Sequence, residues 1–511
     1  MTFTLIPSSG IRAIEAAHVS AHPRAPLMPR AGKAVAHWAL TFLKQRKSKT
    51  RNVLILAGPG NNGGDAWLAA QLLAEGKCHT TVLALGEHKF KDPAAKQAQL
   101  AYKKSGLIVR TWADVAATAY EFDLIIDGLF GSGLRRAPSG AFANTIRAVN
   151  ESRERHGTTV LAIDVPSGLD ADNGFAFDPA IVADHTLTFI AHKPGLHTGA
   201  GVDHVGLVEL DTLGVDVPIS GDALLDHDSL AALVGPRRRN VHKGSFGDVG
   251  IIGGAEGMVG AAILAARAAL HMGPGKVLLG LVTNERVAYD PLHPEIMMRD
   301  AKLLAKDETV TAYAVGMGMG DGGIGATVLH GVITSDKPTV LDADALITLV
   351  SNPSIGAAFE AKKAGKPHQC LSFVFTPHPG EAARLLKIST ADVQADRIGS
   401  AKQLAVLFQS IVVLKGAGTV IATPDGRYFI NPTGNPGMAS GGMGDALSGM
   451  IAGFLAQGME SLDAAKLAVY LHGAAADAAL EHGMAPRGLT ASEVIFEARM
   501  LLNSGLEHGE H

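Results

Sequence analysis

The 511-residue sequence predicts an α/β protein built from two domains in series. Its length exceeds what a single hydrophobic core usually spans. Apolar residues make up 47% of the chain and aromatic residues only 5%, a balance that favours layered α/β packing over an aromatic-rich sandwich. Short apolar runs alternate with alanine-rich helical stretches, which is the pattern of a parallel sheet with helices on both faces.

The first domain is expected to span residues 1–217. A helix is expected over GGDAWLAAQLLAEG (63–76), directly after the first strand, because a glycine turn leads into an apolar, alanine-rich run. The predicted strands lie in RNVLILAGPG (51–60), HTTVLAL (79–85), FDLIIDGLFG (122–131) and TTVLAIDVPSG (158–168).

The alternation weakens near Val217, and residues 218–235 combine turn residues, charges and one short helix. We interpret this stretch as a linker, followed by a second domain over 236–511. Its predicted strands lie in DVGIIGG (248–254), GKVLLGLV (275–282), YAVGMG (313–318), PTVLDADAL (338–346), SFVFTPH (372–378), SIVVLKG (410–416) and GTVIATPDG (418–426).

Charge and composition exclude several classes of partner. A formal charge of −4 gives no basic footprint for nucleic acid. The N-terminus lacks a basic segment followed by an apolar run, so we expect no signal peptide. Cys78 and Cys370 are far apart and without partners at metal-binding spacing, which favours a reducing cytoplasm. The most apolar stretch, 261–282, is interrupted by charged residues and predicts a helix, a turn and a strand, so we expect no membrane span.

The stretch NPTGNPGMASGGMGDALSGM (431–450) places a glycine-rich turn before a predicted helix, with Asp445 at the junction. Such a turn can present successive backbone N–H groups to an anion, and the helix adds the positive end of its dipole. A carboxylate in that place could accept the proton of a hydroxyl that attacks a phosphoryl group. The alternative is a tight turn in which Asp445 only caps the helix.

A second glycine-rich turn, LKGAGTVIATPDG (414–426), follows another predicted strand. There Lys415 and the backbone donors that follow could meet the phosphate or ribose of a nucleotide. Two such turns favour the phosphate-binding interpretation over simple capping.

At this point the chain resembles the ribokinase-like superfamily, whose members place a GxGD turn at the point of phosphoryl transfer. The resemblance is closer to one branch, the ADP-dependent dehydratase that repairs hydrated NADH and NADPH, and covers roughly residues 226 to 505. Four motifs carry it in order: KGSFGDVGIIGGAEGMVGAAILAARAAL (243–270), TPHPGEAARLL (376–386), LKGAGTVIATPDG (414–426) and NPTGNPGMASGGMGDALSGM (431–450).

The resemblance implies a set of site residues in a ribokinase-like second domain. Asp445 would be the catalytic base beside the hydroxyl of the damaged nicotinamide ring. Met317 and Met319 flank the family's glycine position in VGMGMG, where GPGLG is usual. The pocket for the hydrated dinucleotide would be lined by Ala262, Gly318, His378 and Asp445. ADP would be bound by Lys415, Gly416, Ala417, Gly418, Thr419 and Gly444.

The implied chemistry is coherent, because hydroxide is a poor leaving group. Transfer of phosphate from ADP to the ring hydroxyl makes a good one, and elimination then restores the dihydronicotinamide. Phosphoryl transfer also implies Mg²⁺ on the nucleotide. His378 by itself is more often a structural turn histidine, and only its motif suggests a role at the site.

In the first half, LAGPGNNGGDAWLAAQLL (56–73) also places a glycine turn between a strand and a helix, but the pattern is not GxGxxG. Asn and Asp here could simply cap the helix. Asp127 and Asp164, however, end two further strands, and carboxylates at neighbouring strand ends converge on one crevice. Amide, carboxylate and hydroxyl oxygens suit a group I or II cation.

Three motifs, GPGNNGGD, DGLFGSGLRRAPSG and AIDVPSGLDADNG, resemble the Rossmann-like N-terminal epimerase domain of the same repair enzyme over about residues 5 to 215. The resemblance implies that K⁺ is bound by Asn62, Asp127 and Ser167. Asp164 is the preferred catalytic acid/base and Arg135 the second choice. The hydrated dinucleotide would be bound by Asn61, Asn62, Gly63, Gly64, Asp65, Gly131, Ser132, Gly133, Leu134, Arg135, Arg136, Ala137 and Asp164.

Two segments receive no assigned role. HKPGLHTGAG (192–201) has the look of the family, and RRRNVHKG (237–244) is interpreted as solvated linker, with an approach of Lys243 to substrate phosphates as the alternative.

The sequence as a whole predicts a bifunctional enzyme for which NADHX, NADPHX and ADP are the small-molecule partners. The first domain would interconvert the R and S epimers of hydrated NAD(P)H, and the second would dehydrate the S epimer. We also expect a homo-oligomer. One alternative is a vitamin-precursor kinase with a non-catalytic first domain, and a second is a binding or scaffolding role for that domain. The preference for ADP over ATP comes from the resemblance alone.

Overall fold

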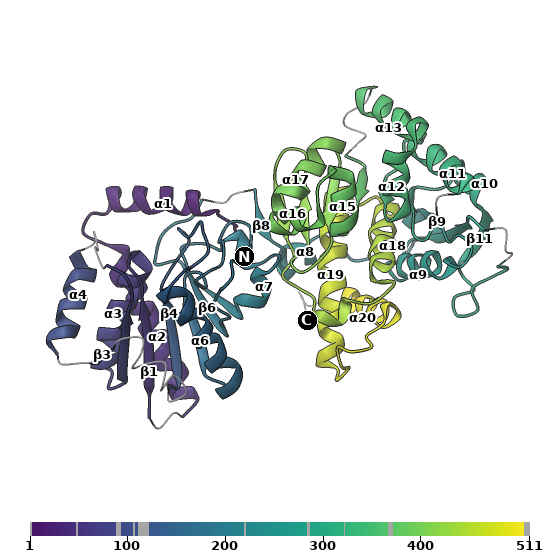
Figure 1. Cartoon of the computed structure of the whole chain (residues 1–511). Helices are drawn as coiled ribbons and strands as arrows, with labels where there is room; N and C mark the ends of the chain where they lie inside the picture. Colours follow the sequence, from purple (N-terminus) through teal and green to yellow (C-terminus); the bar gives the residue numbers. More distant parts are fainter. Residues whose placement is uncertain are drawn as a thin grey trace. The chain divides into compact units, whose positions relative to one another are not determined.

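The computed structural model describes residues 3–47, 50–87, 93–105, 108–110, 122–218, 221–283, 287–320, 322–365 and 371–504 (Figure 1). Cys370 lies outside them. The chain separates into two compact units, Phe3–Ser220 and Gly221–His511. Each unit is an α/β layered structure, so the predicted fold class is confirmed.

The first unit consists of helices around one seven-stranded sheet. Its helices are α1 (Ser8–Ala21), α2 (Leu27–Gln45), α3 (Asn61–Glu75), α4 (Pro93–Lys104), α6 (Ala141–His156), the 3₁₀ helix η2 (Pro194–Leu196) and α7 (Gly201–His204). Its strands are β1 (Asn52–Ala57), β2 (His79–Ala84), β3 (Ile108–Arg110), β4 (Leu124–Gly128), β5 (Thr159–Ile163), β6 (His185–Phe189) and β7 (Leu207–Asp211).

This sheet is parallel throughout, with strand order β3-β2-β1-β4-β5-β6-β7. The chain moves outward from β1 to β3 and then returns to β4 on the other side of β1. Ligands of open α/β sheets bind beyond the carboxyl ends of the strands at such a reversal. The turn after β1 and the end of β4 therefore stand side by side, where this type of sheet binds ligands.

Side chains alternate between the two faces of the first sheet. Val53 and Ile55 of β1 pack with α2 and α3 on one face, whereas Leu54 and Leu56 pack with Ile146 of α6 on the other. Strand residues that are buried on both faces produce the continuous apolar runs of the sequence.

The second unit contains a ten-stranded sheet. Its strands are β8 (Ala223–Leu224), β9 (Asp248–Gly253), β10 (Lys276–Leu281), β11 (Met297–Asp300), β12 (Ala312–Val315), β13 (Thr339–Leu341), β14 (Phe373–Phe375), β15 (Ile411–Leu414), β16 (Val420–Ala422) and β17 (Tyr428–Ile430). Its helices are α8 (His227–Ala231), η3 (Lys243–Phe246), α9 (Val259–His271), α10 (Ala301–Leu304), α11 (Gly323–Thr334), α12 (Asp344–Ser351), α13 (Pro353–Gly365), α15 (Pro379–Leu386), α16 (Thr390–Ala395), α17 (Arg397–Phe408), η4 (Pro436–Met438), α18 (Met443–Ala456), α19 (Ser461–Glu481) and α20 (Ala491–Ser504).

The strand order is β11-β10-β9-β12-β13-β14-β15-β16-β17-β8. Strands β11 to β15 are parallel, while β16 pairs antiparallel with both β15 and β17. The short β8 pairs with β17 at the edge. Part of the stretch interpreted as a linker, 218–235, thus forms β8 and α8 of this unit.

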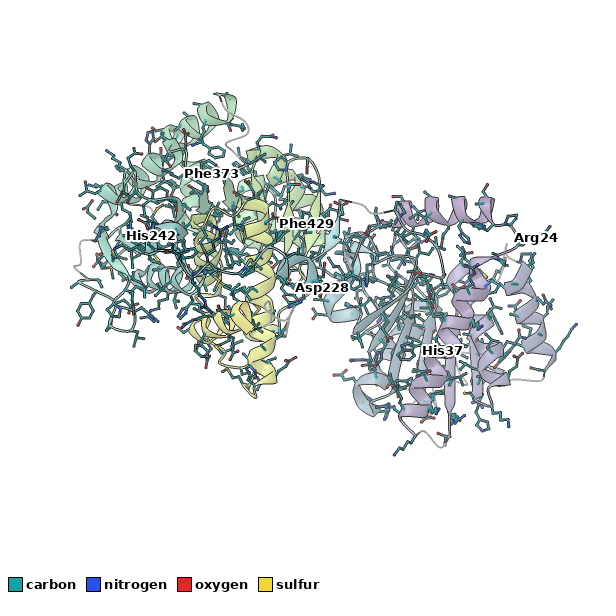
Figure 2. The ribbon with its side chains drawn as sticks, turned by 180° about the vertical axis from the view of Figure 1, so that it is seen from behind. Arg24, His37, Asp228, His242, Phe373 and Phe429 are labelled. Atoms are coloured by element: carbon teal, nitrogen blue, oxygen red, sulfur yellow. The ribbon has the colours of Figure 1, made fainter. Side chains whose placement is uncertain are left out.

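Helices cover both faces of the second sheet as well. In β14, Val374 faces the core formed with α9 and α18, whereas Phe373, which is labelled in Figure 2, and Phe375 contact Phe359 of α13 on the other face.

Helix α18 lies very close to α9. A Cβ on Gly449 would lie 2.0 Å from the carbonyl oxygen of Ala265, so only glycine allows this approach. Small residues therefore allow the backbones of the two helices to touch, and this contact helps to position α18.

The apolar stretch 261–282 forms most of α9, a turn and β10. In the part of the chain that the structure describes, no helix has the length and apolar composition needed to cross a membrane.

Candidate active sites

The glycine turn after β1 positions Asn62 at the start of α3, beside the ends of β4 and β5. Its Nδ2 atom donates hydrogen bonds of 2.9 Å to Phe130 O and 3.0 Å to Ile163 O, so the side chain ties the start of α3 to the segments that follow β4 and β5. A Cβ on Gly63 would lie 1.8 Å from Gly58 O. The glycine of this turn is therefore required by backbone packing.

Asp127 and Ser167 form a buried pair at the ends of β4 and β5. Oδ1 of Asp127 accepts a 2.7 Å hydrogen bond from Ser167 Oγ, and Oδ2 accepts one of 2.8 Å from Ser167 N. Burial raises the pKa of Asp127 to about 6, although the hydrogen bonds from Ser167 oppose that rise.

The oxygens near Asn62 are chemically suitable for K⁺. Asp127 supplies a carboxylate, Ser167 a hydroxyl and Asn62 an amide oxygen, and large hard cations accept this donor set. Nowhere among the described residues do three His, Cys, Asp or Glu side chains form a ready-made cation cage. A K⁺ ion would therefore depend on neutral oxygens in addition to Asp127.

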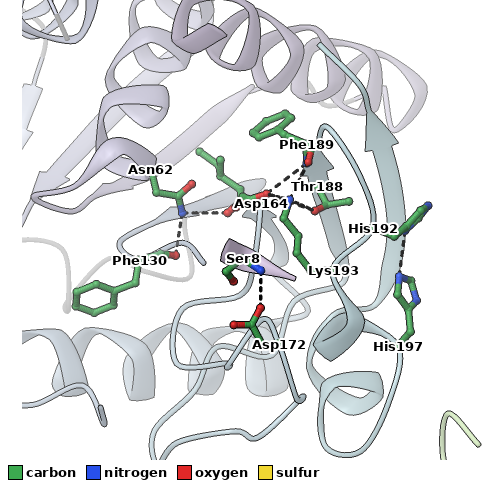
Figure 3. Close-up of polar contacts among 11 residues, drawn as sticks. Ser8, Asn62, Phe130, Asp164, Asp172, Thr188, Phe189, His192, Lys193 and His197 are labelled. Carbon is green, nitrogen blue, oxygen red and sulfur yellow. Dashed lines mark hydrogen bonds and ion pairs between the residues drawn. The ribbon is translucent and has the colours of Figure 1, made fainter. Parts of the chain in front are cut away.

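Asp164 occupies the turn after β5 with a left-handed backbone, φ +66°. Its carboxylate makes an ion pair with Lys193, and its Oδ1 atom also accepts a 3.3 Å hydrogen bond from Phe189 N (Figure 3). The Asp164 side chain is 17% exposed and that of Lys193 is 0% exposed. Asp164 is therefore partly accessible to solvent, whereas the cation that it contacts is fully buried.

The loop with the two arginines is largely exposed. Arg135 pairs with Asp172 at 3.1 Å and with Asp170 at 3.5 Å, and Asp172 also accepts a 2.6 Å hydrogen bond from Ser8 N at the start of α1. The remaining predicted binding residues divide by exposure: Gly133, Arg136, Ala137 and Asn61 are exposed, Gly131, Ser132 and Leu134 are half-buried, and Gly64 and Asp65 are buried.

In the second unit, three strand ends share one hydrogen-bonded network. Lys415, which follows β15, donates a 2.7 Å hydrogen bond to Oδ1 of Asp342, which follows β13. Ser448 of α18 donates to Oδ2 of Asp342 at 2.8 Å and lies 3.3 Å from the hydroxyl of Thr376 after β14. Burial opposes the charge of Lys415, but Asp342 and Glu381 more than offset it and raise its pKa.

Asp445 lies in the first turn of α18, half-buried. Burial, followed by the charge of Asp342, raises the pKa of Asp445 to about 6, although Lys415 lowers it. A Cβ on Gly444 would lie only 3.1 Å from Lys415 Nζ, so this turn of the helix directly faces the ammonium group. Gly442 caps the N-terminus of this helix in a left-handed conformation, and the first N–H groups of a helix have no partners within it.

His378 caps α15, and its Nδ1 atom accepts a 3.0 Å hydrogen bond from Gly380 N. Glu381 reciprocates by accepting a 2.7 Å hydrogen bond from His378 N. The imidazole is otherwise exposed and borders a cavity of about 650 Å³ that Asp344 and Glu381 also line. Burial raises the pKa of Glu381.

The turn after β15 is stabilised from inside by a residue that the sequence analysis did not identify. The buried Arg397 donates 3.2 Å hydrogen bonds to Leu414 O and Lys415 O, and a Cβ on Gly416 would lie 2.9 Å from its Nη1 atom. Thr419 closes the turn by donating a 2.9 Å hydrogen bond to Gly416 O. Gly418, after Ala417, has φ +60°.

Ala262 and Gly318 lie near the ends of β9 and β12, which are the other strands of this sheet that contribute predicted site residues. Ala262 is fully buried against the loop after β9, and Gly318 has φ +58°, with Met258 only 2.8 Å from the place of a Cβ. Met317 and Met319, which replace the usual family residues, are buried. They leave the left-handed glycine between them unchanged.

The basic segment 237–243 lies toward the amino ends of β9 and β10. Arg237 donates hydrogen bonds to Gly273 O at 2.7 Å and to Gln457 at 2.6 Å, and its guanidinium stacks over Phe246. Gln457 follows the last turn of α18, whereas Asp445 is in the first. Lys243 precedes β9, so it stands away from the strand ends that hold Lys415.

Sequence reasoning missed four polar residues of these networks: Lys193, Asp342, Arg397 and Ser448. Asp342 ends a strand in VLDADAL, so the argument used for Asp127 and Asp164 would have found it. Lys193 and Arg397 carry no local signal, because a single basic residue in a loop or helix is usually solvated.

Two sets of polar side chains at strand ends, one of which brings a lysine, an aspartate and a helix N-terminus together, indicate a two-domain nucleotide-binding enzyme. The N-terminal part matches the family model described as YjeF-related protein N-terminus over residues 24–195, and the C-terminal part matches NAD(P)H-hydrate dehydratase over residues 249–497. The chain belongs to the family of bifunctional NAD(P)H-hydrate repair enzymes.

Relatives that match along the whole chain establish this membership. The bifunctional NAD(P)H-hydrate repair enzyme of Coxiella burnetii is 36% identical over 93% of this chain and 94% of its own length. The enzyme of the same description from Escherichia coli is 36% identical over 97% of this chain and 93% of its own. The ADP-dependent (S)-NAD(P)H-hydrate dehydratase of Neisseria meningitidis is 41% identical over 52% of this chain and 88% of its own.

Among solved structures, an ADP/ATP-dependent NAD(P)H-hydrate dehydratase from Bacillus subtilis, co-crystallised with ATP and Mg²⁺, is 30% identical and has a TM-score of 0.46. It covers 54% of this chain and 96% of its own. A ribokinase-like superfamily protein from Enterococcus faecalis is 25% identical, with a TM-score of 0.47, and covers 56% and 97%.

Proposed function

We propose that the first unit interconverts the epimers of hydrated NADH and NADPH and that the second dehydrates the S epimer at the expense of ADP. The observation that carries the second activity is the position of Asp445, in the first turn of α18 and beside the Lys415–Asp342 pair. A base, a cation and a helix N-terminus together match what phosphoryl transfer to a hydroxyl needs.

In the dehydration, the oxygen of the ring hydroxyl bonds to the terminal phosphorus of ADP, and Asp445 accepts the proton that this hydroxyl loses. The bond from that phosphorus to the bridging oxygen breaks, and AMP leaves. The carbon–oxygen bond of the new phosphate ester then breaks, phosphate leaves with the electron pair, and the neighbouring ring carbon loses a proton. The products are AMP, phosphate and the reduced cofactor.

The other predicted residues of the second unit would bind the nucleotide and the hydrated dinucleotide. Lys415 and the turn through Gly416, Ala417, Gly418 and Thr419 receive the nucleotide, and Gly444 leaves room for its phosphates beside the lysine. His378, which lines the 650 Å³ cavity, would contact the hydrated dinucleotide. Ala262 and Gly318 keep the loops after β9 and β12 close.

Mg²⁺ fits this site as an ion carried by the nucleotide. Mg²⁺ usually keeps several waters and takes one or two carboxylates together with substrate phosphates. Glu381 and Asp344, on the wall of the cavity, would hold it from the protein side. Bound there, it would neutralise charge on the phosphate oxygens.

In the first unit, Asp164 takes the proton of the hydroxyl on the hydrated carbon; that oxygen forms a C=O bond as the bond from the carbon to the ring nitrogen breaks, and the electron pair stays on the nitrogen. The nitrogen then attacks the other face of the carbonyl carbon, and Asp164 returns the proton to the oxygen. Asn62, Asp127 and Ser167 would hold K⁺. The loop 131–137, with Arg135 and Arg136, and residues 61–65 would bind the phosphates of the dinucleotide. Arg135 now pairs with Asp172, so phosphate binding would replace an existing ion pair.

A direct assay tests the proposal. The full chain is incubated with mixed epimers of hydrated NADH and with ADP, and the absorbance of the reduced nicotinamide is followed. Complete recovery supports both activities, and recovery of the S epimer alone supports only the dehydratase. No recovery, together with phosphorylation of a vitamin alcohol, would favour the kinase alternative, which the full-length relatives do not favour.

The homo-oligomer and the cytoplasmic location remain predictions. Light scattering of the purified chain tests the first, and fractionation of the producing cell tests the second.

A further inference from the structure

Lys193 is a fully hydrogen-bonded residue of the segment 192–201, which has no role assigned from the sequence. Its ammonium group donates to Oδ1 of Asp164, to Thr188 Oγ1 at 2.9 Å and to Phe189 O at 2.8 Å. An ammonium group has three protons, so all of its donors are used. With 0% exposure, the side chain cannot touch a substrate.

The two oxygens of Asp164 are not equivalent. Oδ1 accepts from Lys193, from Phe189 N at 3.3 Å and from Thr188 Oγ1 at 3.4 Å. Oδ2 has no hydrogen-bond partner within the described part of the chain, and the side chain is 17% exposed. The carboxylate is thus held by one oxygen and presents the other.

A buried cation of this kind is costly unless its partner is charged. Lys193 is in ion-pair contact with Asp164, and removal of either charge would leave the other uncompensated. Asp164 also adopts a left-handed backbone, which favours glycine, asparagine or aspartate and costs energy that the surrounding contacts must offset. The ammonium group supplies the strongest of these contacts.

We propose that Lys193 is a positioning residue of the epimerase site, which holds Oδ1 of Asp164 so that the ionised Oδ2 faces the substrate. The inference rests on the proposed role of Asp164 and adds to it the residue that makes Asp164 a base with a fixed direction.

The other titratable groups nearby do not replace Lys193. His192 and His197 lie on the same segment, 3.0 Å apart, and burial lowers the pKa of both, to about 4 and about 3, so they are neutral at neutral pH. From α1, Glu15 faces the pair and also interacts with Arg12, and burial together with the charge of Asp164 raises the pKa of Glu15. Lys193 is therefore the buried countercharge of Asp164.

The test uses the full chain and four variants: Lys193→Met, Asp164→Asn, the double variant, and Arg153→Met as a control. Arg153 pairs with Asp184 at 2.8 Å in the same unit and at a distance from the site in the fold, on α6. Epimerisation is measured without ADP by separating the R and S epimers chromatographically. The dehydration of purified S epimer with ADP is measured on each preparation as an internal control.

Lys193→Met is expected to lower kcat for epimerisation roughly 10- to 100-fold with less than a threefold change in KM, because the lysine acts on the base and does not contact substrate. The double variant is expected to be no slower than Asp164→Asn, because Lys193 acts through Asp164. Arg153→Met is expected to keep kcat.

The outcomes separate the two claims. Epimerisation retained in Asp164→Asn would refute the proposed role of Asp164 itself. Loss in Asp164→Asn with kcat within twofold in Lys193→Met would overturn the positioning role alone. If Lys193→Met does not fold, Thr188→Val decides the question, since it removes one acceptor of the ammonium group and keeps the charge pair. A severalfold lower kcat supports positioning, and an unchanged kcat overturns it.

Discussion

The ammonium group of Lys415 lies 2.7 Å from Oδ1 of Asp342, and this ion pair joins the ends of β15 and β13 across the end of β14. Asp344, Glu381 and Asp445 all act electrostatically on the same region. A site with so many carboxylates repels a nucleotide unless positive potential is also present. We propose that Lys415 and the N-terminus of α18 supply it, so that their arrangement decides where the phosphates lie.

Asp445→Asn is expected to abolish the dehydration of the S epimer, with kcat lowered about 10²- to 10⁴-fold, because an amide cannot accept the hydroxyl proton. ADP should still bind, since its proposed contacts are with other residues, and calorimetry measures this. Asp425→Asn, an exposed acid at the turn between β16 and β17, is the matched control and should keep full activity. A fully active Asp445→Asn enzyme would contradict the mechanism.

The pH dependence of the dehydratase follows from Asp445, whose pKa is raised to about 6. A base must be ionised, so kcat/KM is expected to be constant above pH 7 and to fall tenfold per unit well below pH 6. The raised pKa also means that the folded state prefers the protonated carboxyl. Wild-type stability should therefore improve relative to Asp445→Asn as pH falls through about 6, with the gain complete below the ordinary value of 3.8. A rate profile that is flat from pH 5 to 8 would show that another group is the base.

Lys415→Met is expected to raise the KM for ADP and to destabilise the second unit by about 3 kcal/mol, because it leaves Asp342 buried without a countercharge. The double variant Asp342→Asn with Lys415→Met should recover much of the stability but not the affinity for ADP. Thermal unfolding and ADP titration separate the two effects. Recovery of ADP affinity in the double variant would show that Lys415 serves only to neutralise Asp342.

Potassium is expected to activate the epimerase when compared with lithium at equal ionic strength. Asp127→Asn should remove this activation, since it deletes the one carboxylate of the proposed set, and it should also lower the Tm, because Ser167 N loses a charged acceptor. Asp203→Asn, exposed on α7, serves as the control. Equal rates in both salts would refute the potassium site and leave the assignment of Asp164 standing.

Two glycines of the β1 turn give a matched pair of substitutions. Gly63→Ala would place a Cβ 1.8 Å from Gly58 O, whereas a Cβ on Gly60 would meet nothing within 4 Å. Gly63→Ala is therefore expected to lower the free energy of unfolding of the first unit by about 3 kcal/mol or more and to remove epimerisation. Gly60→Ala should fold and react normally. Equal unfolding curves for the two variants would show that the turn is not packed as described.

The local chemistry of the sequence was sufficient for the fold class and for much of the candidate sites. Continuous apolar runs ending in glycine or aspartate predicted parallel strands, and the structure places Asp127 near the end of β4 and Asp164 directly after β5, as expected. These signals are readable because strand burial and turn formation depend on neighbouring residues. The end of β13 carries the same signal at Asp342, so that residue was within reach of the same argument.

Only the tertiary structure decided which of these groups meet. Lys193 finds Asp164 across 29 residues, and Lys415 finds Asp342 across 73. Such pairs depend on strand order and on how closely helices approach the sheet, as Gly449 shows at the contact of α18 with α9. The sequence alone determined two glycine-rich strand-end sites with carboxylates. The packing determined which carboxylate receives a buried cation, because the cost of burying a charge is set by neighbours that are distant in the chain.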